Sequence, residues 1–337
     1  MSSATPLLLS GFADEAANQK TIDQQFSALA ALGMRYFSIR FIDAGNGVKN
    51  VMALDDAEIA LVKEKLTEYG LTVSSIGSPI GKSKLCDVDD GTTTGYRPFA
   101  EYLQNEVARA CELANTFGTK LIRGFSFYHP KGSELETHFA QAVDQVGQIA
   151  DVCDSAGLTY GLEVEANLVG QTGQLLARMH QEIARDALVT IFDGGNLVMQ
   201  GFSEEEVFQQ YVAMKPGLGW IHIKDFKDPA GSARVTHVDE ETIKHFVPAD
   251  VGQSGHAAIM KDFAGFLPEL HERMAKRGVP GVFADMEPHV KGGGQFGGFS
   301  GPDGFGVALR AFCRVCDEAG IEYRLRDFSD IQSDRGF

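Results

Sequence analysis

The feature that most constrains the fold of this 337-residue chain is a unit that recurs along its whole length. In each unit a short apolar run ends in glycine or in polar residues, and an amphipathic stretch of helix length follows. A chain that alternates strands and helices in this way pairs its strands in parallel, through right-handed crossover connections. The eight runs that we expect to contain strands are 6–15, 36–41, 71–79, 120–128, 158–165, 188–196, 219–226 and 281–289.

The stretches between the runs carry the period of amphipathic helices. Apolar residues recur three and four positions apart, most clearly in 21–33, 56–70, 101–118 and 139–157. These four stretches include a glycine at or near the end, the residue that most readily takes the left-handed conformation that closes a helix. Asp55 and Asp56 stand where a residue that caps the start of a helix is expected.

Eight such units predict a closed (β/α)8 barrel. A doubly wound parallel sheet normally carries a glycine-rich phosphate loop after its first strand. The segment GFADEAAN, residues 11–18, does not have the G-x-G-x-x-G spacing of that loop. We therefore predict one (β/α)8 barrel domain over residues 1–337, a length that barrels with extended loops reach.

Three predicted connections are longer than usual for a barrel. They follow the third, seventh and eighth runs and cover 81–98, 225–262 and 291–306. Long loops on the catalytic face of a barrel usually bind or cover a substrate. No Gly-Lys-Ser/Thr ends the glycine-rich stretch 291–306, so it is either a flexible surface loop or a substrate lid, and not a phosphate loop.

Bulk composition excludes several classes of function. The formal charge of −16 repels phosphate backbones, so we expect no nucleic-acid partner. No apolar run approaches the roughly 18 residues of a membrane span, and the first residues do not have the pattern of a signal peptide. Five widely spaced cysteines do not form a disulfide framework, and Cys313 and Cys316 fall within one helical pattern. We therefore expect a cytoplasmic protein with no membrane partner.

The last four runs carry ionisable or polar side chains where a barrel interior meets solvent. They are Glu163 and Glu165, then Asp193 and Asn196, then His222, Lys224 and Asp225, and then Asp285, Glu287 and His289. Charges there are costly unless they are paired or bind a metal. A divalent ion would suit converging carboxylates and one imidazole. The alternative is a network of salt bridges with Arg40, Arg123 and Lys224.

These motifs make the chain similar to a known family. It resembles the xylose-isomerase-like barrel superfamily, which includes sugar phosphate isomerases and epimerases, tagatose epimerases and endonuclease IV. The resemblance covers nearly the whole chain. It is carried, in order, by SAGLTYGLEVE, FDGGN, IHIKD and DMEPH, and GFADE and GSPIGK also look like one subgroup.

The resemblance implies a metal site and its ligands. Matched motif by motif, Glu163, Asp193, His222 and Glu287 would bind one divalent ion, which would be Mn, Mg, Co or Zn. Glu165 remains an alternative to Glu163 as ligand or base. Asn196 stands where many members have histidine, and it can bind a substrate hydroxyl but cannot carry a proton. The chain lacks the further histidines of endonuclease IV at these strand ends, which disfavours DNA repair.

The implied activity is a sugar isomerase or epimerase that removes a proton next to a carbonyl. Glu163 and Glu287 would act as the pair of acid/base groups, and His129 is a candidate for a separate one. The same site would also suit a lyase that cleaves 3-oxo-glycosides. A sugar-binding barrel without catalysis is the third alternative.

The substrate is expected to be a small carbohydrate, and the protein could form a homo-oligomer. The candidate substrate-binding residues are Arg40, Arg123, Glu165, Asn196, Lys224, Asp225, His256 and His289. Arg40 and Arg123 could instead form salt bridges in the barrel core, and Lys224 and Asp225 could pair with each other. Lys82 is a possible contact for an anion.

Overall fold

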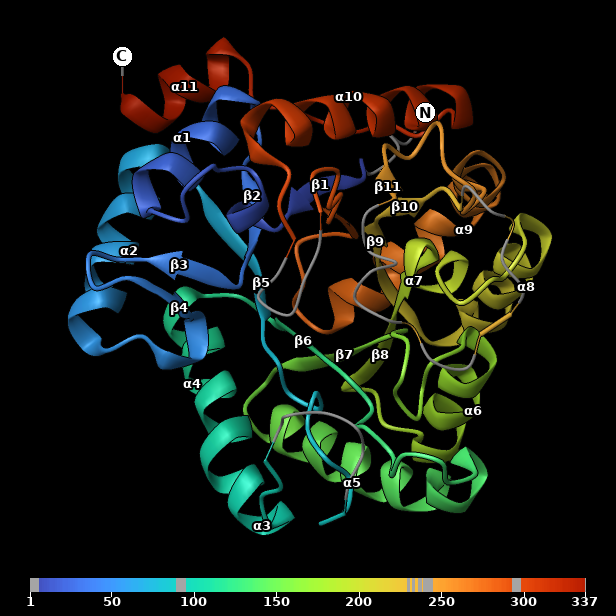
Figure 1. Cartoon of the computed structure of the whole chain (residues 1–337). Helices are drawn as coiled ribbons and strands as arrows, with labels where there is room; N and C mark the ends of the chain where they lie inside the picture. Colours follow the sequence, from blue (N-terminus) through green and yellow to red (C-terminus); the bar gives the residue numbers. More distant parts are fainter. Residues whose placement is uncertain are drawn as a thin grey trace.

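The predicted barrel is confirmed in a computed structural model of the chain (Figure 1). The structure describes residues 6–88, 95–228, 231, 234–235, 238, 245–292 and 298–336. Eight parallel strands form one sheet in the order β1-β12-β9-β8-β7-β6-β5-β2. A parallel bridge between Phe12 and Ser38 joins its two ends, so the barrel is nearly closed.

Each barrel strand coincides with one of the predicted apolar runs. The strands are β1 (Leu8–Gly11), β2 (Tyr36–Ile39), β5 (Thr72–Gly77), β6 (Leu121–Gly124), β7 (Thr159–Glu163), β8 (Leu188–Asp193), β9 (Leu218–Ile223) and β12 (Phe283–Met286). Only β9 starts outside its run, by one residue. Parallel strands buried on both faces need nearly continuous apolar sequence, which is why the runs located them.

Helices surround the barrel and cover its outer face (Figure 1). The principal ones are α1 (Ile22–Ala31), α2 (Asp56–Tyr69), α4 (Ala108–Phe117), α5 (Leu135–Ser155), α6 (Gly173–Ile183), α8 (Glu204–Met214), α9 (His256–Lys276) and α10 (Gly301–Ala319). A short helix α3 (Phe99–Tyr102) and a π-helical turn (Leu103–Val107) precede α4, and α11 (Phe328–Arg335) is the last helix. Asp55 caps α2 in a capping box with Glu58.

The long connections contain some regular structure. A hairpin of β3 (Phe41–Asp43) and β4 (Val48–Asn50) follows β2, and β10 (Asp225–Phe226) pairs with β11 (Phe246–Val247) after β9. The predicted loop 291–306 is shorter than expected, because α10 begins at Gly301. Residues 89–94, most of 229–244 and 293–297, which belong to the three predicted loops, lie outside the described residues.

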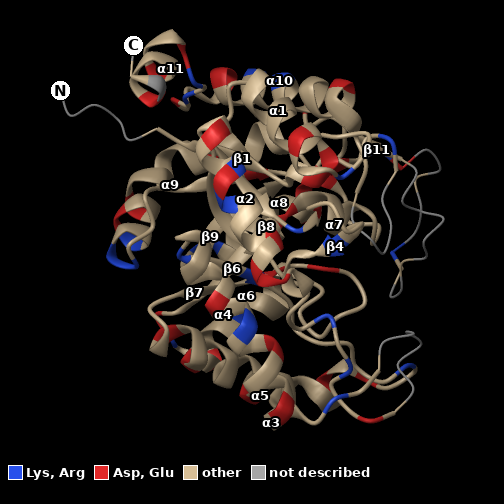
Figure 2. Ribbon diagram, turned by 90° about the vertical axis from the view of Figure 1, so that its left-hand side faces the viewer, with Lys and Arg blue, Asp and Glu red and all other residues tan. Residues whose placement is uncertain are grey.

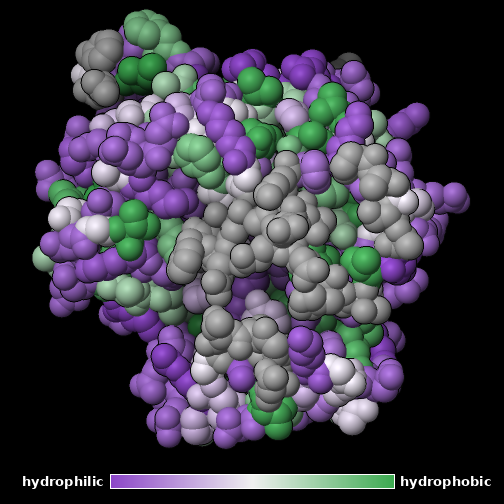
Figure 3. Space-filling model, viewed as in Figure 1, coloured by the Kyte–Doolittle hydropathy of each residue, from purple (hydrophilic) through white to green (hydrophobic). Residues whose placement is uncertain are grey.

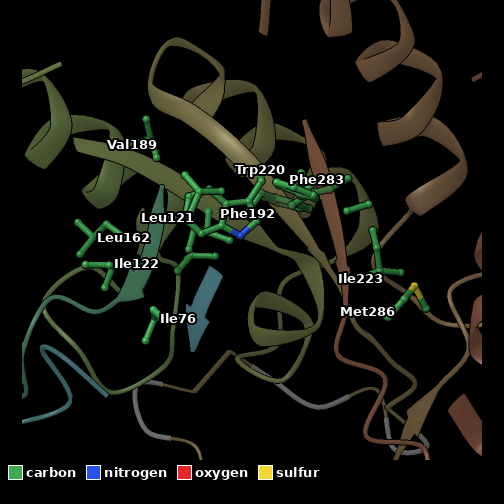
Figure 4. Close-up of a cluster of buried hydrophobic side chains, with 14 of the residues drawn as sticks. Ile76, Leu121, Ile122, Leu162, Val189, Phe192, Trp220, Ile223, Phe283 and Met286 are labelled. Carbon is green, nitrogen blue, oxygen red and sulfur yellow. The ribbon is translucent and has the colours of Figure 1, made fainter. Parts of the chain in front are cut away.

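The core of the barrel is apolar, with a small polar layer inside it. Figure 4 shows large buried side chains such as Trp220, Phe192 and Phe283 among the strands. Within the barrel, the hydroxyls of Ser10 and Ser74 are 2.7 Å apart, and Ser38 donates to Asp285 at 2.7 Å. Hydrogen bonds of this kind let polar groups remain buried.

The outer surface is charged and hydrophilic. Acidic residues are spread over the surrounding helices (Figure 2), and the face viewed in Figure 3 is mainly hydrophilic where it is described. No helix in the described parts of the chain has the length and apolar character needed to cross a membrane.

One glycine in the barrel makes room for the largest core side chain. A Cβ added at Gly161, on β7, would overlap the ring of Trp220. We expect Gly161→Ala to lower the free energy of unfolding by about 1–3 kcal/mol, because a close-packed interior cannot absorb the added methyl. Gly265, within α9, has open space at its Cβ position, so Gly265→Ala should raise stability by up to about 1 kcal/mol. Urea denaturation of both variants checks this, and equal effects would contradict it.

Candidate metal centre

Four adjacent strands bring the predicted ligands to one point at the C-terminal end of the barrel. Glu163 ends β7, Asp193 ends β8, His222 lies one residue before the end of β9, and Glu287 directly follows β12. One ligand atom from each of the four lies within 4.8 Å of the others. All four side chains are buried. The structure therefore assembles the predicted set, and these groups could hold a metal ion.

The environment of His222 is the clearest sign that this set suits a cation. Its Nδ1 lies 3.4 Å from a carboxylate oxygen of Glu163 and 3.4 Å from one of Glu287, and 3.9 Å from Asp193. Neither ring nitrogen has a hydrogen-bond partner in the described residues. The other nitrogen, Nε2, faces Asp285 at 4.0 Å. A buried imidazole among three carboxylates fits a divalent ion with oxygen and nitrogen ligands.

Without a bound ion, two of the four candidate ligands hold protons that an ion would displace. Burial lowers the pKa of His222, but Glu163 and Glu287 outweigh it and raise that pKa to about 10. Burial raises the pKa of Asp193 to about 7, against the opposing effect of Lys224. A metal binds the neutral imidazole and the ionised carboxylate, so it competes with protons at both groups.

Metal binding is therefore expected to release protons and to strengthen as the pH rises. Without an ion, His222 carries the extra proton of the imidazolium at pH values below about 10, and Asp193 is protonated at pH values below about 7. Binding of Mn²⁺ should release about two protons per ion at pH 6 and about one at pH 8. Calorimetry in buffers of different ionisation enthalpy measures this number. A release that is near zero at both pH values would contradict the assignment.

The alternative of a salt-bridge network is also present around the same carboxylates. Arg123 pairs with Glu163 at 3.1 Å, and Arg40 pairs with Glu287 at 2.6 Å. Lys224 lies 2.9 Å from Asp193 and 3.1 Å from Glu287. Each glutamate keeps one oxygen near His222 and gives the other to an arginine. The arginine pairs are thus compatible with a central ion. Lys224, in contrast, contacts the same Asp193 and Glu287 oxygens that face His222, so an ion would compete with it for them.

The structure separates the two glutamates of strand β7. Strand β7 ends at Glu163, so the alternation of side chains between the two faces of the strand does not extend to Glu165. Glu165 is not part of the four-residue cluster. Glu165 instead pairs with Lys82 at 2.8 Å. Asn196 donates to Glu163 at 3.3 Å and to the Val164 carbonyl at 3.0 Å, so its amide orients the glutamate.

A cavity of about 250 Å³ lies next to the cluster, of which Glu287 is part of the cavity lining. Of the residues predicted to bind substrate or act in catalysis, it is lined by Arg40, Arg123, Glu165, Asn196, Lys224, Glu287 and His289. Lys82 lines it as well, together with aromatic residues such as Phe125 and Phe246. The cavity therefore places most of the predicted residues around one space beside the candidate metal centre.

Besides Glu163, Asp193 and His222 of the cluster itself, three predicted residues lie outside the lining of this cavity. The Asp225 carboxylate accepts hydrogen bonds from the backbone N–H groups of Phe226, Gln253 and Ser254, which fixes the turn after β9. The Nε2 of His256 lies 3.1 Å from the Lys224 carbonyl oxygen. His129 contacts Pro130 and Ser133 in its own loop. In this structure all three take part in local hydrogen bonding.

Two acidic residues near the start of the chain support the cavity and were not predicted individually. Glu15 accepts from the His289 backbone at 2.8 Å and lies 2.7 Å from its Nδ1. Asp14 holds the Arg40 guanidinium at 3.2 Å. Both belong to GFADE, so the only signal in the sequence was that subgroup motif.

Comparisons with known proteins agree with this fold. The family model described as xylose isomerase-like TIM barrel matches residues 26–313. The chain belongs to this family. No curated protein sequence matches it significantly.

Solved structures with this fold cover almost the whole chain. A xylose isomerase-like TIM barrel protein from Mycobacterium smegmatis, in complex with magnesium, is 17% identical over 94% of this chain and 97% of its own, with a TM-score of 0.57. The IolI protein with a bound zinc atom is 13% identical over 93% and 98%, with a TM-score of 0.59. A D-allulose 3-epimerase from Methylomonas sp. is 15% identical over 94% and 100%, also with 0.59. At these identities the likeness shows the shared fold.

Proposed function

We propose that this protein is a divalent-metal-dependent sugar isomerase or epimerase. The observation that carries the proposal is the buried cluster of Glu163, Asp193, His222 and Glu287 in a xylose isomerase-like barrel, next to a cavity that Glu287 lines. Family neighbours that are sugar epimerases, such as the D-allulose 3-epimerase, support the reaction class. The cavity volume of about 250 Å³ falls below the roughly 300–1,000 Å³ of pockets for drug-sized ligands, which favours a single sugar unit.

In this proposal the ion, when bound, would polarise the carbonyl of the sugar and stabilise negative charge on its oxygens. Glu163 and Glu287 each have a carboxylate oxygen 3.4 Å from His222 Nδ1, and we assign to them the removal and return of the carbon-bound proton. Burial raises the pKa of Glu163, but His222 and Arg123 oppose it and bring that pKa down to about 2. Burial also raises the pKa of Glu287, but Lys224, His222 and Arg40 together outweigh burial, so this pKa falls well below the usual value. Both groups are thus ionised at neutral pH, as a base must be, but pKa values so far below neutral make them weaker proton acceptors.

Lys224 and Arg40 would hold charge that develops during the reaction. Both cations lie beside Glu287 and also line the cavity. A donor that is already in place when charge develops stabilises the transition state without reorganisation. Asn196, fixed against Glu163, is placed to hydrogen-bond a substrate hydroxyl.

The test is hydrogen exchange at carbon. The protein, loaded with Mn²⁺, is incubated in heavy water with a panel of neutral ketohexoses and followed by NMR. We expect deuterium at the carbon next to the carbonyl, with formation of an epimer or aldose, and no exchange after the metal is chelated. Cleavage of 3-oxo-glycosides without such exchange would favour the lyase, and sugar binding without either reaction would favour the binding barrel.

A further inference from the structure

The charged groups of the cavity are divided between two sides of the barrel. The adjacent strands β7, β8, β9 and β12 supply the candidate metal ligands. The strands on the other side supply three of the cations that line the cavity: Arg40 follows β2, Lys82 lies in the segment after β5, and Arg123 is on β6. A ligand that extends from the metal centre towards β5 and β6 therefore meets positive charge.

Arg123 is a buried cation with unused donors. Its side chain is only 6% exposed, and its guanidinium carbon lies 5.0 Å from the ring centre of Phe12 and 4.7 Å from that of Phe125. One of its amino groups donates to Glu163 at 3.1 Å, whereas its buried Nε has no hydrogen-bond partner within the described ranges. A guanidinium offers five N–H donors, and an unmatched buried donor is costly. The arrangement thus points to acceptor atoms that a ligand would bring.

Lys82 contacts the Phe125 ring, which Arg123 also contacts. Its Nζ lies 4.3 Å from the ring centre of Phe125, and it pairs with Glu165 at 2.8 Å. The Lys82 side chain is 34% exposed and that of Glu165 is 19% exposed, so the pair lies at the accessible side of the cavity. An exposed pair of this kind is weak and can be exchanged for another anion.

The carboxylates of the site do not neutralise both cations fully. Glu163 shares its charge between Arg123 and the cluster around His222, where an ion would claim it. Among the described residues, four cations line the cavity (Arg40, Lys82, Arg123 and Lys224), but only two carboxylates do (Glu165 and Glu287). The other carboxylate partners of these cations lie behind the lining: Asp14, Glu15, Glu163 and Asp193. An anion that enters the cavity therefore meets more cations than carboxylates on its wall.

We propose that Lys82 and Arg123 form an anion subsite, and that the substrate is a sugar carrying a carboxylate or phosphate group away from its carbonyl. The inference rests on the proposed function for the position of the carbonyl end at the metal centre. Arg123 presents a planar fork that suits either oxyanion, and Lys82 adds a mobile point charge. Arg40 and Lys224 are engaged by Glu287 and belong to the metal centre instead.

The experiment compares charged and neutral sugars as ligands of the full-length, Mn²⁺-loaded protein by calorimetry. D-glucuronate and D-glucose 6-phosphate separate the carboxylate from the phosphate, and D-glucose is the neutral reference. We expect at least one of the anionic sugars to bind roughly tenfold or more tightly than D-glucose, because one hydrogen bond to a charged group is worth about that factor.

Three variants test the assigned residues. Lys82→Met should remove most of the preference for the anionic sugar, whereas Glu165→Gln should increase it, because the competing carboxylate loses its charge. Lys131→Met makes the same change as Lys82→Met on an exposed lysine outside the cavity lining, and should leave the preference unchanged. Arg123→Lys keeps the charge and loses the fork, so it should give an intermediate effect. Thermal melting establishes that each variant is folded.

The subsite would be overturned if neither anionic sugar bound more tightly than D-glucose, or if folded Lys82→Met kept the preference. These outcomes are distinguishable from failure of the proposed function. Deuterium exchange into neutral ketohexoses, with equal affinity for charged and neutral sugars, would support the proposed function and contradict the anion subsite. Tighter binding of anionic sugars that depends on Lys82, without any deuterium exchange, would support the anion subsite and contradict the proposed isomerase or epimerase activity.

Discussion

Replacement of Glu287 by glutamine is expected to lower metal-dependent turnover by roughly 10²–10⁴-fold, the usual contribution of a positioned acid/base group. The amide cannot accept a proton, and it leaves the ion pairs with Arg40 and Lys224 without their anion. The loss should appear in kcat, because the group acts after the sugar is bound. Steady-state kinetics on the sugar identified by deuterium exchange measure it.

The matched control for this prediction is Glu182→Gln. Glu182 is an exposed residue of α6 that pairs with Arg178 and does not line the cavity. Its replacement makes the same chemical change and should leave turnover as it is. An active Glu287→Gln variant with normal metal content would remove Glu287 from the proposed chemistry.

Replacement of His222 by asparagine is expected to weaken Mn²⁺ binding at least roughly a hundredfold. The loss of a partner that only supports a ligand already costs about 10–100-fold in affinity, and loss of a ligand should cost no less. Competition with a fluorescent chelator gives the affinity. Because bound metal stabilises the folded state, added Mn²⁺ should raise the melting temperature of the wild type and have little effect on the variant.

His180→Asn is the control for the metal prediction. This histidine lies in α6, outside the candidate cluster, and burial lowers its pKa. We expect its replacement to leave Mn²⁺ affinity unchanged. If His222→Asn bound Mn²⁺ as tightly as the wild type, the four-residue centre would be wrong.

The strands and their polar ends were predictable because their signal is local. A parallel strand buried on both faces is an apolar run, and a barrel gathers the C-terminal ends of all such runs. Asp193 and His222 could be assigned from this rule with their motifs. Glu163 and Glu165 could not be separated, because strand alternation carries both to one face. Only the end of β7 at Glu163 separates them.

The loops were less predictable because their course depends on contacts distant in sequence. His129 was a plausible acid/base from its place after a strand, but Phe127 takes a left-handed φ of 70° two residues earlier and His129 lies outside the cavity lining. The role of Glu15 depends on His289, which is 274 residues away. The chain by itself gave no sign of that pair.

An anomalous-scattering map of crystals grown with Mn²⁺ tests the proposed metal centre most directly. We expect one strong peak bound by Glu163, Asp193, His222 and Glu287. Glu15, Glu287 and His289 form a second group that could hold a metal, although Arg40 already contacts Glu15 and Glu287 there. A peak at that second group alone, or no peak near His222, would contradict the four-residue metal centre.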